Sequence, residues 1–113
     1  MQERYGDVLP PVYITENGAS FDDQVGADGE INDVQRINYV GEHLSTALAA
    51  VAPGGAAQGL DLRGFFVWSL LDNWEWAAGF TQRFGIIHVD FDSGTRTPKA
   101  SYKWLQDVTR ARQ

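Results

Sequence analysis

Short apolar runs alternate with polar segments along the chain, and their spacing predicts strand, helix, strand and helix in that order. The first run, Val12 to Glu16, is rich in β-branched and aromatic residues, which is typical of a short buried strand. The second run, "LRGFFVWSLL" from about Leu62 to Leu71, is apolar almost throughout, as expected of a parallel strand covered on both faces. Both runs end on polar or charged residues.

The region between the two strands is predicted to be a loop and a helix. Residues 19–33 are rich in Asp and Gly, which favours a long loop. Asn32 can serve as the N-cap of the helix, with Gln35 completing a capping box, and Pro53-Gly54-Gly55 ends the helix. Apolar residues then recur at steps of three and four, which defines one helical face: Val34, Ile37, Val40, Leu44, Leu48 and Val51.

The last third of the chain predicts a short hairpin and a second helix. Residues 85–98, "GIIHVDFDSGTRTP", contain a strand followed by a turn at Asp92-Ser93-Gly94. Thr97 can cap the final helix, with Pro98 in its first turn. Its buried face would hold Trp104, Leu105 and Val108. The alternation of strands and helices predicts an α/β fold with a parallel sheet, in which active sites lie at the carboxyl ends of the strands.

The composition of the chain argues against several classes of protein. The chain has 113 residues, 43% of them hydrophobic and 21% charged, which is ordinary for a globular domain. The formal net charge is −6 and basic residues do not cluster, so nucleic-acid binding is disfavoured. No apolar run approaches the roughly 18 residues of a membrane span. The absence of cysteine excludes disulfides and fits a cytoplasmic location, and the N-terminal segment does not resemble a signal peptide.

Glu16 is the first candidate for chemistry, because it ends an apolar strand. Burying a carboxylate is costly unless the group is paired or hydrogen-bonded. A carboxylate at a strand end acts either as a nucleophile or general acid/base, or as a structural acid that bonds the loop backbone. The strand alone leaves both readings open.

A cluster of tryptophans surrounds a second acid. Trp68, Trp74 and Trp76 lie within nine residues, and Glu75 stands between two of them. Aromatic faces stack on the C–H faces of sugar rings, and a neighbouring carboxylate can accept two sugar hydroxyls, so the cluster indicates a carbohydrate subsite. Packing in the core is the alternative. Retaining glycosidic cleavage needs two carboxyl groups about 5–5.5 Å apart, and spacing alone would pair Glu16 with Glu75.

Two motifs in this order resemble a known family. "YITENG" and "FFVWSLLDNWEWAAGFTQRFGIIHVDF", with "DGEINDVQRINYVGEHLSTA" between them, closely resemble the C-terminal part of glycoside hydrolase family 1, the retaining β-glucosidases of bacterial type. The resemblance covers nearly the whole chain. It implies the last quarter of a (β/α)8 TIM barrel: strand 7, helix 7, strand 8, a short hairpin and helix 8. Residues 1–113 are then one incomplete domain, without a separate second domain.

The resemblance also implies roles for individual residues. Glu16 matches the catalytic nucleophile, and Glu75 matches an acid that binds glycone hydroxyls, so Glu75 is not the acid/base partner of Glu16. Trp68 matches the platform beneath the sugar ring. Trp76 matches a donor of an indole N–H to a sugar hydroxyl, and Phe84 matches an aromatic residue that closes the pocket.

The chain differs from the family members that act on 6-phosphorylated sugars, and this difference bears on its expected substrate. Members acting on 6-phosphorylated sugars replace the acid with Ser and carry a Lys-x-Tyr triplet, where this chain has Glu75, Gln82 and Phe84. A carboxylate at Glu75 would repel a phosphate. The resemblance therefore favours unphosphorylated β-glucosides, with no metal or cofactor. From their places in the predicted helix and hairpin, His43 and His88 are interpreted as structural residues.

The family's acid/base lies in an Asn-Glu-Pro motif, which these 113 residues lack. We therefore expect the chain alone to be inactive, and to need the missing N-terminal part of the barrel or self-association, because two strands leave edges and apolar faces exposed. Two alternatives from other classes are a sugar-binding module without catalysis and a barrel segment that assembles with copies of itself.

Overall fold

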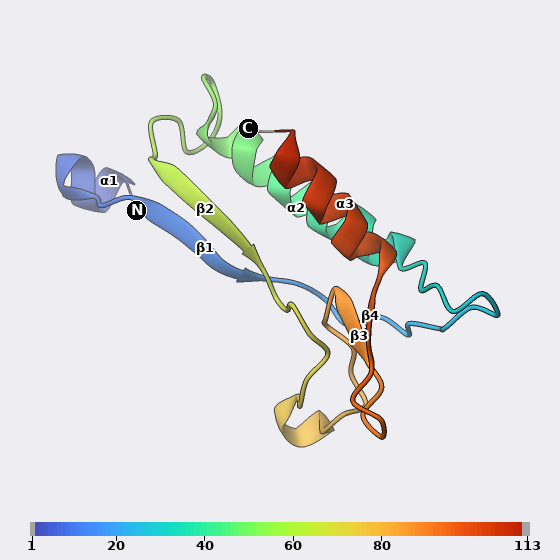
Figure 1. Ribbon diagram of the computed structural model, residues 1–113. Helices are drawn as coiled ribbons and strands as arrows, with labels where there is room; N and C mark the ends of the chain where they lie inside the picture. The colour runs from blue at the N-terminus through green and yellow to red at the C-terminus, as the bar shows by residue number, and fades with distance from the viewer. Residues whose placement is uncertain (1, 112–113) are drawn as a thin grey trace.

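The computed structural model describes residues 2–111. It begins with a short helix, α1 (Gln2–Tyr5), and a 3₁₀ helix, η1 (Gly6–Val8), neither of which the sequence predicted. A βαβ unit follows, formed by β1 (Val12–Asn17), α2 (Val34–Val51) and β2 (Leu62–Val67) (Figure 1). β1 and β2 pair in parallel, so the predicted α/β fold with parallel strands is confirmed.

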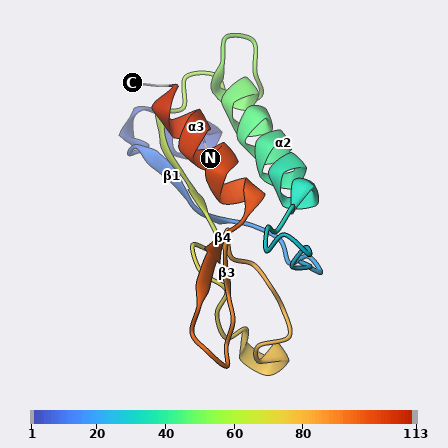
Figure 2. The same ribbon diagram turned by 45° about the vertical axis from the view of Figure 1, so that its right-hand side comes forward.

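The second part of the chain folds against the ends of these strands. It contains the 3₁₀ helix η2 (Trp76–Ala78), the antiparallel hairpin of β3 (Ile87–Val89) and β4 (Arg96–Pro98), and α3 (Ala100–Arg110). Helices α2 and α3 lie side by side and cover the same side of the β1–β2 ribbon (Figures 1 and 2). The hairpin lies beyond the carboxyl end of β2.

β2 is shorter than the sequence predicted, because it ends at Val67 rather than near Leu71. The chain changes partner at this point. The N–H of Ser69 donates to the Phe84 carbonyl at 3.1 Å, and the N–H of Ile87 donates to the Leu70 carbonyl at 2.9 Å. Residues 69–71 therefore follow the segment that leads into β3 instead of continuing beside β1.

The expectation that both strands are buried is wrong. None of the six residues of β1 is buried, and Tyr13 and Phe66 keep 49% and 56% of their surface exposed. The helices cover one face of the ribbon, and no element within residues 2–111 covers the other. In the same part of the chain, β1 and β2 have only each other as neighbours, so each strand has one unpaired edge.

Both predicted helix caps are also wrong, although α2 ends before Pro53 as expected. The N-cap of α2 is Asp33, not Asn32, and its carboxylate accepts hydrogen bonds from Arg36 and Ser101. α3 starts at Ala100, because Thr97 and Pro98 belong to β4, where Thr97 pairs with His88.

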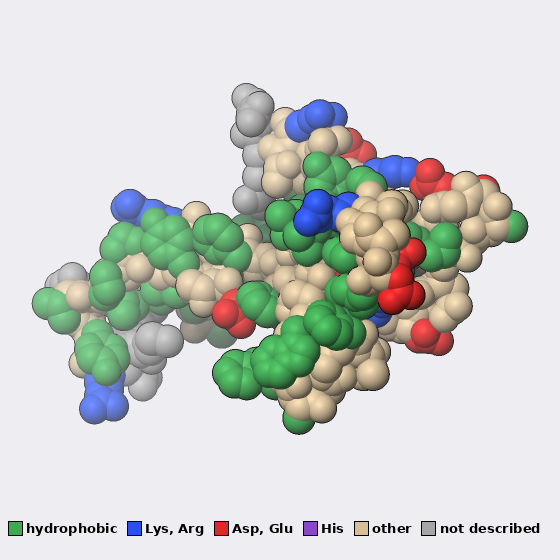
Figure 3. All heavy atoms as spheres, turned by 60° about the horizontal axis from the view of Figure 1, so that its bottom comes forward, with side chains coloured by type: hydrophobic (Ala, Val, Ile, Leu, Met, Phe, Trp, Pro, Cys, Tyr) green, Lys and Arg blue, Asp and Glu red, His purple; other side chains and the backbone are tan. Residues whose placement is uncertain are grey.

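The chain does not enclose a core of its own. Its radius of gyration is 16.8 Å, whereas a compact domain of this length has about 13 Å. Its accessible surface is 7784 Å², against about 6,200 Å² for a folded monomer of this mass. Among the side chains that the structure describes, only Ile31, Val40 and Ile86 are buried hydrophobic residues. Figure 3 shows hydrophobic side chains gathered on the exposed surface instead.

Candidate active site

Glu16 lies near the carboxyl end of β1, and its side chain is exposed. An acid at the end of an apolar strand is expected to be partly buried, and this expectation is wrong for Glu16. Within residues 2–111, β1 has a strand neighbour on one edge only. Glu16 and Trp68 line a depression of about 300 Å³ together with Asn17, Gly18 and Tyr39. The predicted nucleophile and the predicted sugar platform therefore share one surface.

The ends of the two strands approach closely at Gly18. The N–H of Trp68 donates to the carbonyl of Asn17 at 2.9 Å. A Cβ atom on Gly18 would lie 1.8 Å from the carbonyl oxygen of Trp68, far inside van der Waals contact. Glycine at this position thus allows the close approach that brings Trp68 beside Glu16.

Glu75 joins this group through Trp68. The indole Nε1–H of Trp68 donates to Oε1 of Glu75 at 3.3 Å. The backbone of Glu75 is fixed by a tight turn, in which its N–H donates to the Gly79 carbonyl at 2.7 Å and its carbonyl accepts from the N–H of Ala78 at 2.8 Å. The structure therefore gathers Glu16, Trp68 and Glu75, with the tryptophan as the shared member.

Trp76 and Phe84 are joined to this group less directly. Trp76 is 80% exposed and its ring lies beside that of Trp74, with 6.0 Å between the centroids. Its φ of 41° lies in the left-handed region, which costs a residue other than glycine on the order of 1–3 kcal/mol. Phe84 is half-buried, and its carbonyl accepts the Ser69 N–H directly after Trp68.

The loop that carries Glu75 is anchored at Asp72. This carboxylate is buried and accepts hydrogen bonds from Lys99, Arg83 and the backbone N–H groups of Gly85 and Val89. Burial alone would raise the pKa of Asp72, but the hydrogen bonds from Lys99 and Arg83 hold the pKa below its ordinary value. Asp72 therefore fixes the two ends of the loop that carries Glu75.

Sequence reasoning missed Tyr39 and Gly18. Tyr39 lies outside the apolar positions that defined the helical face, and its ring stacks on that of His43 with 4.1 Å between centroids. His43 Nδ1 lies 2.7 Å from the Tyr39 carbonyl, which agrees with the structural role expected of this histidine. In the sequence, Gly18 indicates only a turn after Glu16 and Asn17. The sequence does not show that the Trp68 carbonyl packs against Gly18.

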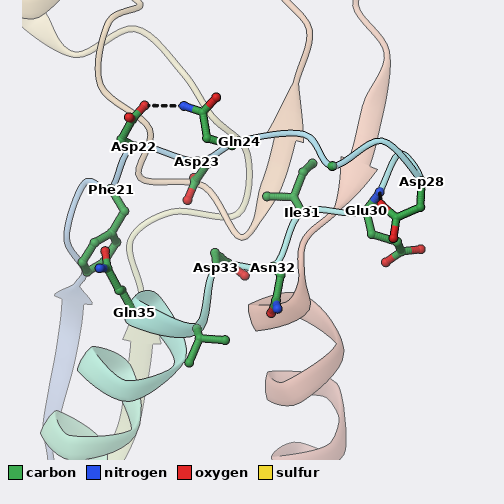
Figure 4. Close-up of a pocket in the computed structure, with 12 residues that line it drawn as sticks. Phe21, Asp22, Asp23, Gln24, Asp28, Glu30, Ile31, Asn32, Asp33 and Gln35 are labelled. Carbon is green, nitrogen blue, oxygen red and sulfur yellow. Dashed lines mark hydrogen bonds between the residues drawn. The ribbon is translucent and has the colours of Figure 1, made fainter.

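A second depression, of about 490 Å³, lies over the acidic loop before α2 (Figure 4). Its acidic side chains already have partners. Asp22 accepts a hydrogen bond from the Gln24 amide, and Asp28 accepts one from the N–H of Glu30. Asp23 and Asp33 form ion pairs with buried cations.

Within residues 2–111, no group of His, Cys, Asp and Glu is arranged to hold a metal ion. The same residues contain no helix long and apolar enough to cross a membrane.

Comparisons with known proteins show which family the chain resembles. The model of glycosyl hydrolase family 1 matches residues 1–113. Beta-glucosidase A of Thermotoga maritima is 48% identical over 101 residues, which cover 89% of this chain and 22% of that protein. Beta-glucosidase A of Acetivibrio thermocellus is 43% identical over 101 residues, covering 89% of this chain and 21% of that protein.

Solved structures give the same result. The family 1 β-glucosidase from T. maritima superposes with a TM-score of 0.85 at 45% identity, over 96% of this chain and 23% of that one. A structure of the T. maritima enzyme in complex with deoxynojirimycin gives the same TM-score. The chain thus spans about a fifth of the length of the relatives it matches and corresponds to a portion of their barrel. On its full-length match to the family model, the chain belongs to glycosyl hydrolase family 1.

Proposed function

We propose that this chain is the last quarter of the barrel of a retaining β-glucosidase, with Glu16 as the nucleophile. The observation that carries the proposal is the grouping of Glu16, Trp68 and Glu75 at the carboxyl ends of two parallel strands. It occurs in a chain that is 48% identical to a β-glucosidase.

The reaction has two displacements. The Glu16 carboxylate attacks the anomeric carbon, the glycosidic bond breaks, and the aglycone oxygen leaves as an alcohol after receiving a proton. Water then hydrolyses the glycosyl ester and regenerates the carboxylate. The proton donor must come from outside these 113 residues, which lack the Asn-Glu-Pro motif.

The remaining residues hold the sugar. The face of Trp68 supports the ring, while Glu75 accepts hydrogen bonds from glycone hydroxyls and Trp76 donates one. Phe84 closes the pocket at the far side. The negative charge of Glu75 disfavours a 6-phosphate, so the proposed substrates are unphosphorylated β-D-glucosides.

Activity requires the rest of the barrel. The radius of gyration, the free strand edges and the uncovered face of the β1–β2 ribbon all support a segment that completes its core with further protein. We propose residues 1–113 as one incomplete domain whose partner is the N-terminal part of such a barrel. The chain alone is then inactive.

Sugar binding without catalysis is the second candidate. It is favoured by the contact between Trp68 and Glu75, because both residues lie in this chain and pair without any other part of the barrel. Self-assembly through the free edges of β1 and β2 is a third outcome that sizing would detect.

A hybrid enzyme tests the first proposal. Residues 1–113 replace the matching segment of T. maritima β-glucosidase A in one polypeptide, and hydrolysis of 4-nitrophenyl β-D-glucoside is measured. We expect turnover, and a loss of about 10⁴-fold or more in kcat for Glu16→Gln. Glu42→Gln, an exposed acid on α2, is the matched control and should keep the parent rate. A folded hybrid without turnover, or equal rates for both variants, would contradict the proposal.

A further inference from the structure

A buried charge cluster lies between the loops that follow β1 and β2. Its members are three carboxylates and three cations, so their charges balance: Asp23, Asp33, Asp72, Arg36, Arg83 and Lys99. Lys99 and Arg36 are 0% and 1% exposed. Because few apolar side chains are buried in this chain, the cluster forms much of its interior.

Asp72 closes the loop that carries Glu75. Its Oδ1 accepts the Gly85 N–H at 2.9 Å, and its Oδ2 accepts Arg83 Nη1 at 2.9 Å and the Val89 N–H at 3.3 Å. Residues 72–85 are therefore held at both ends by one carboxylate. The glycone-binding candidates Glu75 and Trp76 lie within this loop.

Lys99 connects that carboxylate to the other strand. Its Nζ donates to Asp72 Oδ1 at 2.9 Å and to Asp23 Oδ2 at 2.5 Å. Asp23 belongs to the loop that leaves β1 just beyond Glu16, and Figure 4 shows it beside Asp33 ahead of α2. One buried cation thus lies between the loop of the proposed nucleophile and the loop of the proposed sugar ligands.

Arg36 holds the same two loops from the side of α2. It donates to both carboxylate oxygens of Asp23, at 3.0 and 2.8 Å, and also to Asp33. Its Nη2 donates in addition to the Arg83 carbonyl at 2.6 Å, next to Phe84. Without Lys99, Arg36 would still neutralise Asp23, whereas Asp72 would keep a single cation, Arg83, which is partly exposed.

We propose that Lys99 is a positioning residue, which fixes the loop of residues 72–85, and with it Glu75, relative to the end of β1. The part of this inference that concerns the sugar rests on the proposed function. Removing the Lys99 ammonium takes away the one cation that Asp23 and Asp72 share, so the two loops lose this buried link and Asp72 loses one of its two cations. Lys99 itself does not touch substrate.

The test uses the hybrid enzyme with Lys99→Met, Lys99→Arg and the control Lys103→Met. Lys103 pairs with Glu30 at 2.6 Å on the surface and is 59% exposed. Hydrogen exchange is followed by mass spectrometry in peptides covering residues 72–89 and α2. In Lys99→Met, exchange in 72–89 should rise about tenfold or more while α2 keeps its protection, with no change in Lys103→Met. This readout does not depend on catalysis, so it separates failure of the inference from failure of the proposed function.

Kinetics and inhibitor binding give the second readout. In Lys99→Met, KM and the Kd for deoxynojirimycin should rise about tenfold to a hundredfold with a smaller change in kcat, because ground-state binding of the glycone is lost. Lys99→Arg should restore most of the affinity. Faster hydrogen exchange throughout the chain with an unchanged KM would show that Lys99 stabilises the fold without positioning Glu75. This result would overturn the inference.

If Lys99→Met does not fold, Asp23→Asn provides a second test with a smaller change to the cluster. Asp23→Asn keeps the shape of the side chain and removes the charge that Lys99 shares with Arg36. It should also speed exchange in residues 72–89 and raise KM. Unchanged exchange there in a folded Asp23→Asn hybrid would overturn the proposal.

Discussion

The backbone N–H of Trp68 donates a 2.9 Å hydrogen bond to the carbonyl of Asn17. This bond connects the residue after β2 to the last residue of β1, directly beside Glu16. The candidate site thus depends on the register of one pair of parallel strands, and changes at the strand ends should affect it more than changes in the helices.

Gly18→Ala should damage the site in the hybrid enzyme. The new Cβ would meet the Trp68 carbonyl oxygen at 1.8 Å, so the strand ends must separate. We expect a loss of about 1–3 kcal/mol in the free energy of unfolding and a marked fall in kcat/KM. Denaturant unfolding and the glucoside assay measure the two effects.

Gly41→Ala is the matched control. Its Cβ would meet the Trp104 ring at 3.5 Å, an ordinary contact, and alanine favours the helix α2 in which it lies. This variant should be as stable as the parent or more so. If Gly18→Ala behaved like Gly41→Ala, the close approach between Gly18 and Trp68 would be of no consequence.

Asp72 should make the hybrid sensitive to acid. Hydrogen bonds from Lys99 and Arg83 outweigh the effect of burial and lower the pKa of Asp72 in the folded state below its ordinary value of 3.8. The folded state therefore binds this proton less readily than the unfolded state. The stability contributed by Asp72 is complete above pH 3.8 and is lost as the pH falls through the lower, folded-state pKa.

Asp72→Asn should accordingly lose stability at pH 7 and show a shallower decline in acid than the parent. Asp107→Asn, at an exposed position of α3, is the control and should follow the parent curve. Denaturant midpoints at pH 7, 5, 4 and 3 provide the comparison. A parent-like acid slope in Asp72→Asn would show that this carboxylate is not a source of acid sensitivity.

Glu75→Ser should weaken binding of unphosphorylated glucosides. Hydrogen bonds to a charged group contribute about 1.5–3 kcal/mol each, so kcat/KM should fall at least tenfold. Removing the negative charge should at the same time reduce the discrimination against a 6-phosphoglucoside. The ratio of kcat/KM for the two substrates measures this, and an unchanged ratio would argue against contact between Glu75 and the O6 side of the sugar.

The separate 113-residue chain should be inactive and should associate or expose apolar surface. Its uncovered ribbon face and free edges provide the reason. Light scattering and binding of a hydrophobic dye test the physical state, and the glucoside assay tests activity. A dye-negative monomer would contradict the view that it lacks a complete core.

The apolar spacing and turn residues were sufficient to predict the βαβ unit, the extent of α2 and the hairpin turn, because these elements depend on residues close in sequence. The helix caps and the end of β2 depend on distant partners. Asp33 bonds Ser101, 68 positions away, and residues 69–70 bond the segment before and within β3. The contact of Lys99 with Asp23, across 76 positions, leaves no periodic signal either.

The position of Glu16 could be predicted from the sequence, whereas its exposure could not. The strand pattern located it at the carboxyl end of β1, where the structure has it. Its exposure could not be derived, because the apolar pattern of a strand does not show how many of its edges are paired, and within the described residues β1 pairs only with β2. Similarly, Trp68 and Glu75 were identified as neighbours in sequence, but the hydrogen bond between them required the structure.

Trapping of the glycosyl intermediate tests whether Glu16 is the nucleophile. The hybrid enzyme is incubated with 2,4-dinitrophenyl 2-deoxy-2-fluoro-β-D-glucoside, which forms the ester quickly and releases it slowly, and its peptides are mapped by mass spectrometry. We predict the fluoroglucosyl label on Glu16. A label on another residue, or a hybrid that hydrolyses glucosides without ever carrying a label, would show that Glu16 is not the nucleophile.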